Sequence, residues 1–413
     1  MTQQPSDHIE RFLRLDPPED RSRRPPERTA ARRLSYIAFN ILNRLVPKQR
    51  KVVLHSMIDV EDGVLALLEE LSERQIPATV LLEDPAHATA LRVVAPAGVN
   101  AVAKRSLTGV LHFLTAEFVV TTMHVFGDRQ PPANQVQVNI WHGEPPTKIV
   151  ARFFPDTAGI ACTYAPVCST MGRAYRAAEF DLAPQQVPIL GAPRNDRMLR
   201  ADTAAIRAAV TGQEGDLPTL LWLPTHRAGR WGDRERRDTA SDTPAGLPFT
   251  SDELNVLDEW LVEQGARLVL KLHPNDVARL EGSHRAITVL DENYLKSRGL
   301  TLYPLLAAFD GLITDVSSVW VDYLLLDKPM IFAVPDIEDY RRGRGLNLEP
   351  YEDWVPGPFV RTMEELIGAL ADVVGGGDPT ADERRLARRR FHRYADDQSA
   401  VRLLDGLGLT ARG

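Results

Sequence analysis

Short β-branched runs alternate with amphipathic segments along most of this 413-residue chain, and this pattern constrains the fold more than any other feature. Such alternation is typical of parallel sheets whose strands are connected by helices. The candidate strands are Lys51–Ser56, Ala78–Glu83, Phe118–Thr122, Val136–Trp141, Gly159–Tyr164, Val187–Leu190, Thr219–Leu223, Leu268–Leu272, Ile287–Leu290, Gly311–Thr314 and Met330–Val334, with helices such as Asp252–Gln264 and Val316–Leu326 between them. We therefore expect an α/β fold with two doubly wound parallel-sheet domains that face each other.

The boundaries of these domains follow from the positions of proline, glycine and charge. Repeated prolines in the polar N-terminal stretch predict a mobile tail. Gly212 and Gly215, followed by Pro218, indicate a linker. The expected order is a polar tail over residues 1–29, a basic amphipathic helix over 30–47, a first domain over 48–200, a linker over 201–218, a second domain over 219–380 and, over 381–413, an Arg-rich helix that packs back on the first domain.

The segment Ala30–Val46 has apolar residues at helical spacing and is stopped by Pro47. Residues 21–50 around it hold nine arginines and lysines against one acid, Glu27. Two interpretations fit this pattern. The helix either lies on an anionic membrane surface or packs on the first domain.

Overall composition excludes several classes of protein. The chain has 49 basic and 56 acidic residues, a net charge of −7, so we expect no nucleic-acid partner. Its two cysteines, Cys162 and Cys168, form no CxxC pair, and no cluster with metal-ligand spacing occurs, so we expect neither a disulfide scaffold nor a bound metal. The N-terminal stretch has no apolar core of the kind that a signal peptide needs, and the chain has no run of about 18 apolar residues. We therefore expect a cytoplasmic protein, peripheral on the inner face of the cell membrane if the basic helix binds lipid.

Ligands of open α/β sheets bind beyond the carboxyl ends of the strands, so residues that follow strands are candidate site residues. His142 and Gly143 follow one candidate strand, and an imidazole there is mostly a free base at neutral pH. A packing histidine would fit this place equally well. His273 follows a strand of the second domain in the same way, which makes coincidence a weaker explanation.

Two further strand ends of the second domain suit a phosphate. Thr225 and Arg227 offer a hydroxyl and a guanidinium, although an ordinary polar loop is the alternative. Asp315, Ser317 and Ser318 precede a helical run, where a capping side chain and free backbone N–H groups can hold an anion. Capping alone would explain one serine. The chain lacks the P-loop, the dinucleotide fingerprint and the nucleophile elbow, which argues against those enzyme classes.

Taken together, these segments resemble the CDP-glycerol glycerophosphotransferase family, over roughly residues 50 to 405. The resemblance rests on WHG at 141–143, GAPRND at 191–196, PTHR at 224–227, KLHP at 271–274, LITDVSSVWVDYLLLDKPMIF at 312–332 and PGPFVRTMEELI at 356–367. Each motif is short, but six in the family's order are specific as a set.

The resemblance implies the GT-B architecture, two Rossmann-like domains with the active site in the cleft between them. It implies transfer of glycerol phosphate, or a related polyol phosphate such as ribitol phosphate, from a CDP-activated donor to a hydroxyl of a lipid-linked or glycan acceptor. CMP is released, and the product is a teichoic-acid-like or capsule polymer. The CDP-polyol is a substrate, and no cofactor is expected.

The resemblance also implies roles for individual residues. His142 becomes the general base that deprotonates the acceptor hydroxyl, and His273 the second catalytic histidine, close to the donor pyrophosphate. The other candidate ligands of that pyrophosphate are Thr225, Arg227, Ser317 and Ser318, with Asp315 orienting the serine loop or contacting the donor. Gly143, Arg194, Asp322 and Lys328 match the same motifs as supporting residues.

This chain departs from the family pattern at Glu144 and Pro146, at His226, and at His55–Asp59, which replaces an aromatic, glycine-containing stretch. These departures lie mostly in the acceptor-side domain, so they concern the acceptor more than the donor. Two other functions remain open. One is a GT-B glycosyltransferase or epimerase that uses a nucleotide sugar, and the other is a catalytically silent nucleotide-binding scaffold.

Overall fold

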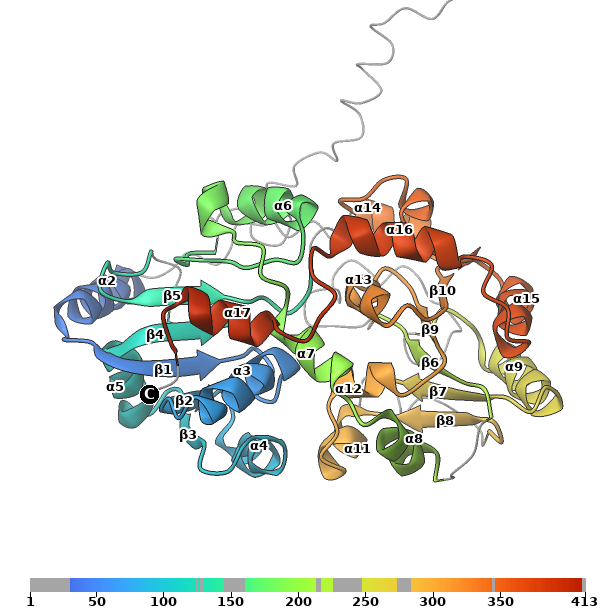
Figure 1. The fold of residues 1–413 in the computed structure, drawn as a ribbon, viewed down its shortest axis with the longest axis horizontal. Helices are drawn as coiled ribbons and strands as arrows, with labels where there is room; N and C mark the ends of the chain where they lie inside the picture. The colour runs from blue at the N-terminus through green and yellow to red at the C-terminus, as the bar shows by residue number, and fades with distance from the viewer. Residues whose placement is uncertain are drawn as a thin grey trace, which may run out of the picture.

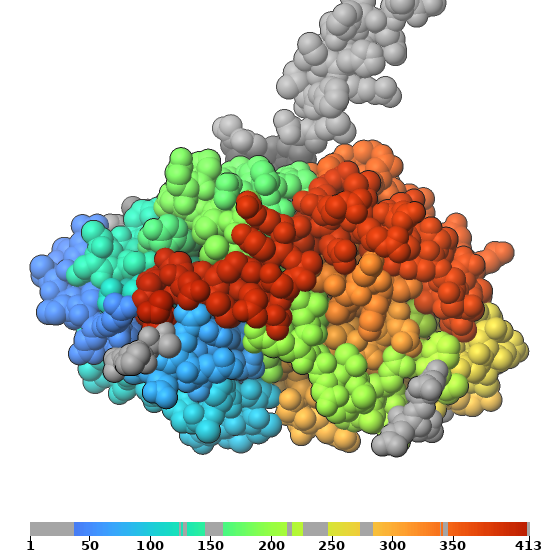
Figure 2. All heavy atoms as spheres, viewed as in Figure 1, coloured from blue at the N-terminus to red at the C-terminus, as the bar shows by residue number. Residues whose placement is uncertain are grey.

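A computed structural model describes residues 30–123, 125–126, 130–144, 160–212, 217–225, 247–272, 284–343 and 346–410, with the backbone alone at 30–36, 339 and 342–343. Two sheets lie side by side, each with helices around it, and the C-terminal segment runs across the front of both (Figures 1 and 2). All strand pairs within both sheets are parallel. The expected α/β fold with two parallel-sheet domains is confirmed.

The first sheet has the strand order β3-β2-β1-β4-β5. Its strands are β1 (Gln49–His55), β2 (Ala78–Leu82), β3 (Asn100–Ala103), β4 (Ala116–Thr121) and β5 (Val136–Asn139). The helices of this half are α2 (Ala30–Leu45), α3 (Asp62–Glu73), η1 (Pro85–His87), α4 (Ala88–Val94), α5 (Leu107–Thr115), α6 (Thr170–Phe180) and η2 (Pro184–Gln186).

The second sheet has the order β11-β10-β9-β6-β7-β8. Its strands are β6 (Thr219–Leu223), β7 (Arg267–Lys271), β8 (Ile287–Leu290), β9 (Gly311–Thr314), β10 (Met330–Ala333) and β11 (Phe359–Val360). Its helices are α9 (Ser251–Glu263), α11 (Glu292–Ser297), α12 (Leu302–Ala307), α13 (Val319–Tyr323), η4 (Leu324–Leu326), α14 (Ile337–Gly343), η5 (Tyr351–Asp353) and α15 (Met363–Val374). Helices α7 (Pro193–Leu199) and α8 (Thr203–Thr211) connect the halves, and α16 (Ala381–Phe391) and α17 (Ser399–Gly406) end the described chain.

Both faces of each sheet are buried, which explains why the strands read as continuous apolar runs. In β1, Val52 and Leu54 enter the core beneath α3 and α17, whereas Val53 enters the opposite core with Phe113 of α5. Alternate residues of β6 divide in the same way between the two cores of the second sheet. This alternation follows from the two-residue repeat of side chains along a strand.

The structure differs from the sequence-based expectations at three places. The described parts of Gly159–Tyr164 and Val187–Leu190 form isolated bridges, Val138 to Tyr164 and Val167 to Ile189, and no strands. The short edge strands β3 and β11 were not predicted. The expected single C-terminal helix is two helices, because residues 392–398 leave helical geometry. Of these two, α17 enters the first-domain core through Leu403 and Leu404, and α16 contacts α6 and η4.

Helix α7 joins the two halves of the molecule. It contacts α3 and α17 on one side and α12 on the other, and Figure 1 shows it between the sheets. No helix in the described part of the chain combines the length and apolar character needed to cross a membrane.

Candidate active site between the two domains

Strand order reverses between β1 and β4 in the first sheet and between β6 and β9 in the second, and ligands of such sheets bind at the carboxyl ends next to this switch point. In the second sheet, Thr225 follows β6 and Asp315 follows β9. The Asp315 carboxylate accepts hydrogen bonds from Thr225 N (2.9 Å), Thr225 Oγ1 (2.5 Å) and Ser317 N (3.2 Å). These three predicted site residues therefore lie together at the switch point.

The serine loop begins α13 in a way that differs from the expectation. Ser318 is the N-cap residue, but its hydroxyl makes no capping hydrogen bond. Ser317 Oγ instead accepts from Val319 N at 3.4 Å. Both serines are half-buried, and α13 continues for one short stretch before a 3-10 turn. The Ser318 side chain is thus directed to another neighbour, Gly143 of the first domain.

Gly143 is where the predicted residues of the two domains meet. A Cβ placed on Gly143 would clash with Ser318 Oγ and would lie 3.4 Å from Ser318 Cβ. A side chain at position 143 would therefore force the Ser318 hydroxyl to turn away from this contact. The loop after β5 and the loop after β9 face each other across the domain boundary, which brings His142 close to the serine loop.

The backbone before His142 is strained. Trp141 has φ of 50°, an uncommon conformation for a residue with a bulky side chain, and its N–H is bound by Asn139 Oδ1 at 2.9 Å. The ring of Trp141 lies against the ring of His142, with centroids 4.4 Å apart. His142 itself is exposed, so the packing-histidine interpretation does not fit its position.

Arg176 of α6 contacts this loop through both its backbone and the Trp141 ring. Its Nη2 donates to Gly143 O at 3.0 Å, and its guanidinium lies 5.3 Å from the Trp141 ring and 4.6 Å from the Phe180 ring. Burial lowers the pKa of Arg176. The sequence analysis missed this residue, because an arginine inside a helix gives no local signal of a contact with a loop about 30 residues earlier.

Arg194 and Asp322, both predicted as supporting residues, form a buried ion pair between α7 and α13. Arg194 Nε and Nη2 bind the two Asp322 oxygens at 3.0 Å each, and Tyr303 donates to Asp322 Oδ2 at 2.8 Å. Glu144 lies 3.5 Å from Arg194 Nη2. Burial opposes the charged form of Arg194, but Asp322 outweighs it and holds the pKa of Arg194 well above its usual range. Both side chains are enclosed, so they support the site without lining it.

Lys328, also predicted as a supporting residue, binds backbone carbonyl groups of the second domain. Its ammonium donates to Ala307 O (2.7 Å) and Phe309 O (2.8 Å) at the C-terminal end of α12, and burial lowers its pKa. His273 and Arg227 lie outside the described residues. Among the residues that the structure describes, no group of three or more histidines, cysteines, aspartates and glutamates could hold a metal ion.

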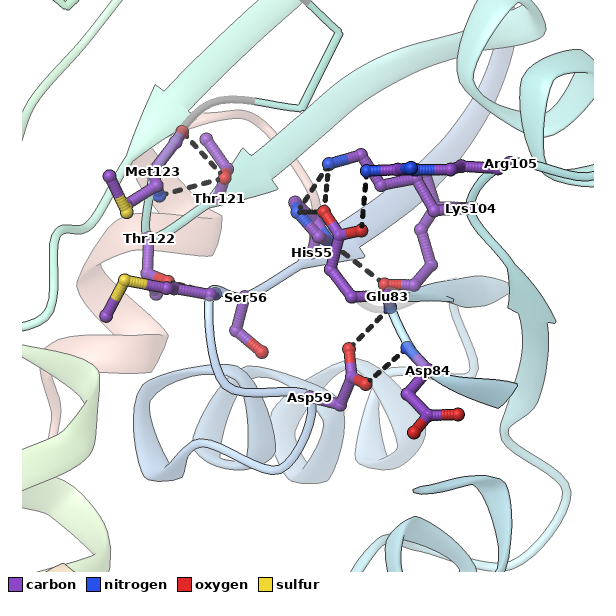
Figure 3. A network of polar contacts seen from close by, with 12 residues as sticks. His55, Ser56, Asp59, Glu83, Asp84, Lys104, Arg105, Thr121, Thr122 and Met123 are labelled. Atoms are coloured by element: carbon purple, nitrogen blue, oxygen red, sulfur yellow. Dashed lines mark hydrogen bonds and ion pairs between the residues drawn. The ribbon is translucent and has the colours of Figure 1, made fainter. Parts of the chain in front are cut away.

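The carboxyl edge of the first sheet carries a polar network that the sequence analysis did not predict (Figure 3). Lys104 contacts Glu83 and His55 Nε2, and burial, followed by the Lys104 charge, lowers the pKa of His55. Asp59 accepts from Glu83 N (2.7 Å) and Asp84 N (2.9 Å). These contacts fix the loops after β1 and β2 relative to each other.

Comparison with known proteins agrees with this geometry. A family model described as CDP-Glycerol:Poly(glycerophosphate) glycerophosphotransferase matches residues 38–407. The chain is 29% identical over 252 residues to the teichoic acid ribitol-phosphate primase of Bacillus spizizenii, covering 59% of this chain and 58% of that one. It is 27% identical over 228 residues to the teichoic acid glycerol-phosphate primase of Bacillus subtilis, covering 55% and 52%. The chain thus spans somewhat more than half the length of these relatives.

Solved structures show the same fold. The wall teichoic acid polymerase TagF superposes with a TM-score of 0.71 at 18% identity, covering 98% of both chains. The UDP-GlcNAc 2-epimerase of Neisseria meningitidis superposes with a TM-score of 0.53 at 11% identity, covering 88% of this chain and all of that one. The GT-B architecture expected from the resemblance is confirmed. Because the family model covers nearly the whole chain, this protein belongs to the CDP-Glycerol:Poly(glycerophosphate) glycerophosphotransferase family.

Proposed function

We propose that this protein transfers a polyol phosphate from a CDP-polyol to a hydroxyl of a lipid-linked or glycan acceptor, in the synthesis of a teichoic-acid-like polymer. The observation that carries this proposal is the contact between Gly143 and Ser318. His142, which is exposed, directly precedes Gly143, and this supports a role for its imidazole beside the serine loop of the second domain. Family membership and the names of the relatives support the same reaction.

In the proposed step, the acceptor oxygen forms a bond to the phosphorus that carries the polyol. The bond between this phosphorus and the bridging oxygen breaks, and CMP leaves with that oxygen. The acceptor proton passes to the imidazole of His142. Phosphoryl-group transfer asks the protein mainly to position the reactants and to stabilise charge on phosphate oxygens.

The donor pyrophosphate is assigned to the second domain. Ser317 and Ser318 supply hydroxyl groups there, and His273 and Arg227 are retained as ligands from the sequence motifs. Thr225 is not assigned as a pyrophosphate ligand, because its hydroxyl donates a hydrogen bond to Asp315. We assign Thr225 and Asp315 to shaping the serine loop.

The reaction is tested by measuring CMP release from CDP-glycerol, with CDP-ribitol and UDP-sugars in parallel and a short prenyl-linked disaccharide as acceptor. We expect CMP from a CDP-polyol and no nucleotide release from the UDP-sugars. Nucleotide release from UDP-sugars alone would support a sugar-transferring or epimerising enzyme. Binding of CDP-glycerol without turnover of any donor would support the silent scaffold.

We further propose that α2 and α5 bring the protein to an anionic membrane. Helix α2 packs on the first domain through Phe39, whose ring lies 5.8 Å from that of Phe113 on α5. The outer face of α2 still exposes Ile41 (53%) and Leu45 (73%). On α5, Leu107 is 85% exposed. The packing of α2 on the first domain is thus confirmed, and its exposed apolar residues support the proposal that the opposite face binds a bilayer.

Co-sedimentation with vesicles of anionic and of zwitterionic lipid tests this surface. The double substitution Ile41→Glu and Leu45→Glu should abolish binding to anionic vesicles. Val93→Glu, at an exposed valine of α4, should leave binding unchanged. Equal sedimentation of all variants would contradict a membrane role for α2.

A further inference from the structure

Each sheet carries a threonine hydroxyl bound to a carboxylate at its switch point. Thr225 and Asp315 form this pair in the second domain. In the first domain, Thr122 directly follows β4, and Glu61 ends the loop that follows β1. Thr122 Oγ1 donates to Glu61 Oε2 at 2.9 Å. Both pairs join the loops that flank the switch point of their sheet, although the threonine follows β6 in the second sheet and β4 in the first.

Thr122 is fixed by a second contact. Its Oγ1 also accepts a hydrogen bond from Met57 N at 3.0 Å, and Figure 3 shows Thr122 beside the loop that begins at Ser56. Because a threonine hydroxyl has one proton, that proton is committed to Glu61. The position of the Glu61 carboxyl is therefore set by the sheet and not by helix α3.

Glu61 is the N-cap residue of α3. The side chain of an N-cap residue ordinarily accepts a hydrogen bond from the helix backbone, and that of Glu61 does not. Among the residues that the structure describes, Thr122 is the one group that donates a hydrogen bond to this carboxyl, and the bond goes to Oε2. The side chain is half-buried. No hydrogen bond from the described residues reaches the other oxygen, Oε1.

Glu61 lies near the segment that leads to His142. A Cβ on Gly63, two residues along the chain, would lie 3.1 Å from Ile140 Cδ1, and Ile140 precedes His142 by two residues. The next residue, Asp62, accepts from Tyr303 N of the second domain at 3.0 Å. Glu61 thus lies where the first domain faces the second.

We propose that Glu61 binds the acceptor, through a hydrogen bond between its Oε1 and a hydroxyl of the sugar or polyol that receives the phosphate. This inference rests on the proposed function and deepens it on the acceptor side. The same loop exposes Met57 (46%) and Ile58 (48%), which suit the apolar face of a sugar ring. These residues stand where the chain departs from the family pattern, and the loop thereby becomes a determinant of acceptor choice.

The ionisation of Glu61 gives the proposal a pH signature. Burial raises the pKa of Glu61 to about 7, while Thr122 and the charge of Arg194 on α7 lower it and Asp62 on α3 raises it further. An ionised carboxylate accepts a hydrogen bond more strongly than a protonated carboxyl. We therefore expect the KM for the acceptor to fall as pH rises through about 7.

The test measures CMP release at varied concentrations of a short prenyl-linked disaccharide, for the full chain and for Glu61→Gln. We expect Glu61→Gln to raise the acceptor KM about tenfold, the effect of losing one hydrogen bond to a charged group, and to remove its pH dependence near neutrality. The KM for the CDP-polyol should stay unchanged, which shows that the variant is folded. An unchanged acceptor KM would overturn the proposal.

A matched control is Glu69→Gln. Glu69 lies on the same helix, burial raises its pKa as well, and it pairs with Arg197 at 3.0 Å away from the Thr122 contact. We expect wild-type acceptor KM for Glu69→Gln. An equal rise in both variants would assign the effect to α3 as a whole and would contradict a contact by Glu61.

Two substitutions of Thr122 test the pairing itself. Thr122→Ser keeps the hydroxyl and should keep the acceptor KM, whereas Thr122→Val frees the carboxyl and should raise it. The same rise for both would contradict the hydroxyl's role. If wild-type protein releases CMP from no donor, the proposed function fails; if it turns over and the Glu61 variant matches it, the present inference alone fails.

Discussion

At the scale of single residues, Gly143 is the point at which the candidate site depends on the absence of a side chain. Its neighbour across the domain boundary is Ser318, and a Cβ at position 143 would meet that hydroxyl unless the serine side chain turned away. The packing of the two loops at this contact therefore depends on Gly143 and Ser318. Its contribution to stability can be measured without measuring activity.

We expect Gly143→Ala to lower the free energy of unfolding by about 1 kcal/mol, the low end of the usual cost of overpacking, because the Ser318 hydroxyl can turn away. Ser318→Gly in the same chain removes the clashing atoms and should restore most of this loss. Urea unfolding of the two single variants and the double variant gives the coupling. Additive costs would contradict the contact.

The buried pair of Arg194 and Asp322 predicts a second coupling. Arg194→Met leaves the buried Asp322 carboxylate without its cation and should cost about 3–5 kcal/mol of stability, whereas Asp322→Leu leaves Arg194 with Glu144 alone and should cost somewhat less. The double variant should cost clearly less than the sum of the two. Arg200→Met is the control, because Arg200 pairs with Asp397 on the surface and should cost at most about 1 kcal/mol. Equal costs at Arg194 and Arg200 would contradict the buried pair.

Glu61 predicts a dependence of stability on pH. Its folded pKa of about 7 lies above the unfolded value near 4.3, so the native state binds the proton more tightly. Stability contributed by the protonated form is present below about pH 4 and is lost as pH rises through about 7.

Glu61→Gln should therefore match wild type near pH 4 and exceed it by up to about 3 kcal/mol near pH 8, in urea unfolding. The comparison between the two proteins cancels the titration of other groups. A constant difference across this range would contradict the raised pKa.

At the scale of elements, helix α12 of the second domain is capped by a residue of the first. Thr301, its own N-cap residue, makes no side-chain capping bond to the helix and donates to Asp62 of α3 instead. Asp62 also accepts from Tyr303 N and pairs with Arg197 of α7 at 2.8 Å. Three helices from both halves thus meet at one carboxylate.

Asp62→Ala should consequently destabilise the protein by more than the loss of an ordinary cap, which costs about 1 kcal/mol. Asp202→Ala provides that reference, because Asp202 caps its own helix α8 through Ala205 N at 3.1 Å. Thermal or urea unfolding of both variants makes the comparison. A smaller loss for Asp62→Ala than for Asp202→Ala would contradict the interdomain cap.

The elements also show what the sequence could predict. Central strands such as β6 and β9 were found because strands buried on both faces read as apolar runs. The short edge strands β3 and β11 carry too few apolar residues for such a signal. At the site, His142, Thr225, Asp315 and the two serines were predicted from their places after strands, and their roles stay predictions. Glu61, Thr122 and Arg176 were not predicted, because their contacts join segments that are distant in sequence.

At the scale of the whole molecule, two Rossmann-like sheets place their switch points on either side of one boundary. Helix α7 and the ion pair of Arg194 with Asp322 fix the sheets relative to each other, and α17 returns to the first domain. In the proposed reaction, the two domains bind different substrates. We propose that the second domain holds the donor phosphates and that the first holds the base and the acceptor.

The most direct test of this account is the turnover number of His142→Ala in CMP release, together with calorimetric binding of CDP-glycerol. A positioned base contributes about 10²- to 10⁴-fold in rate, so turnover should fall by that factor while donor affinity stays within about twofold. His87→Ala, at a histidine of the same sheet edge that pairs with Asp59, should retain turnover. Unchanged turnover in His142→Ala would contradict the central claim.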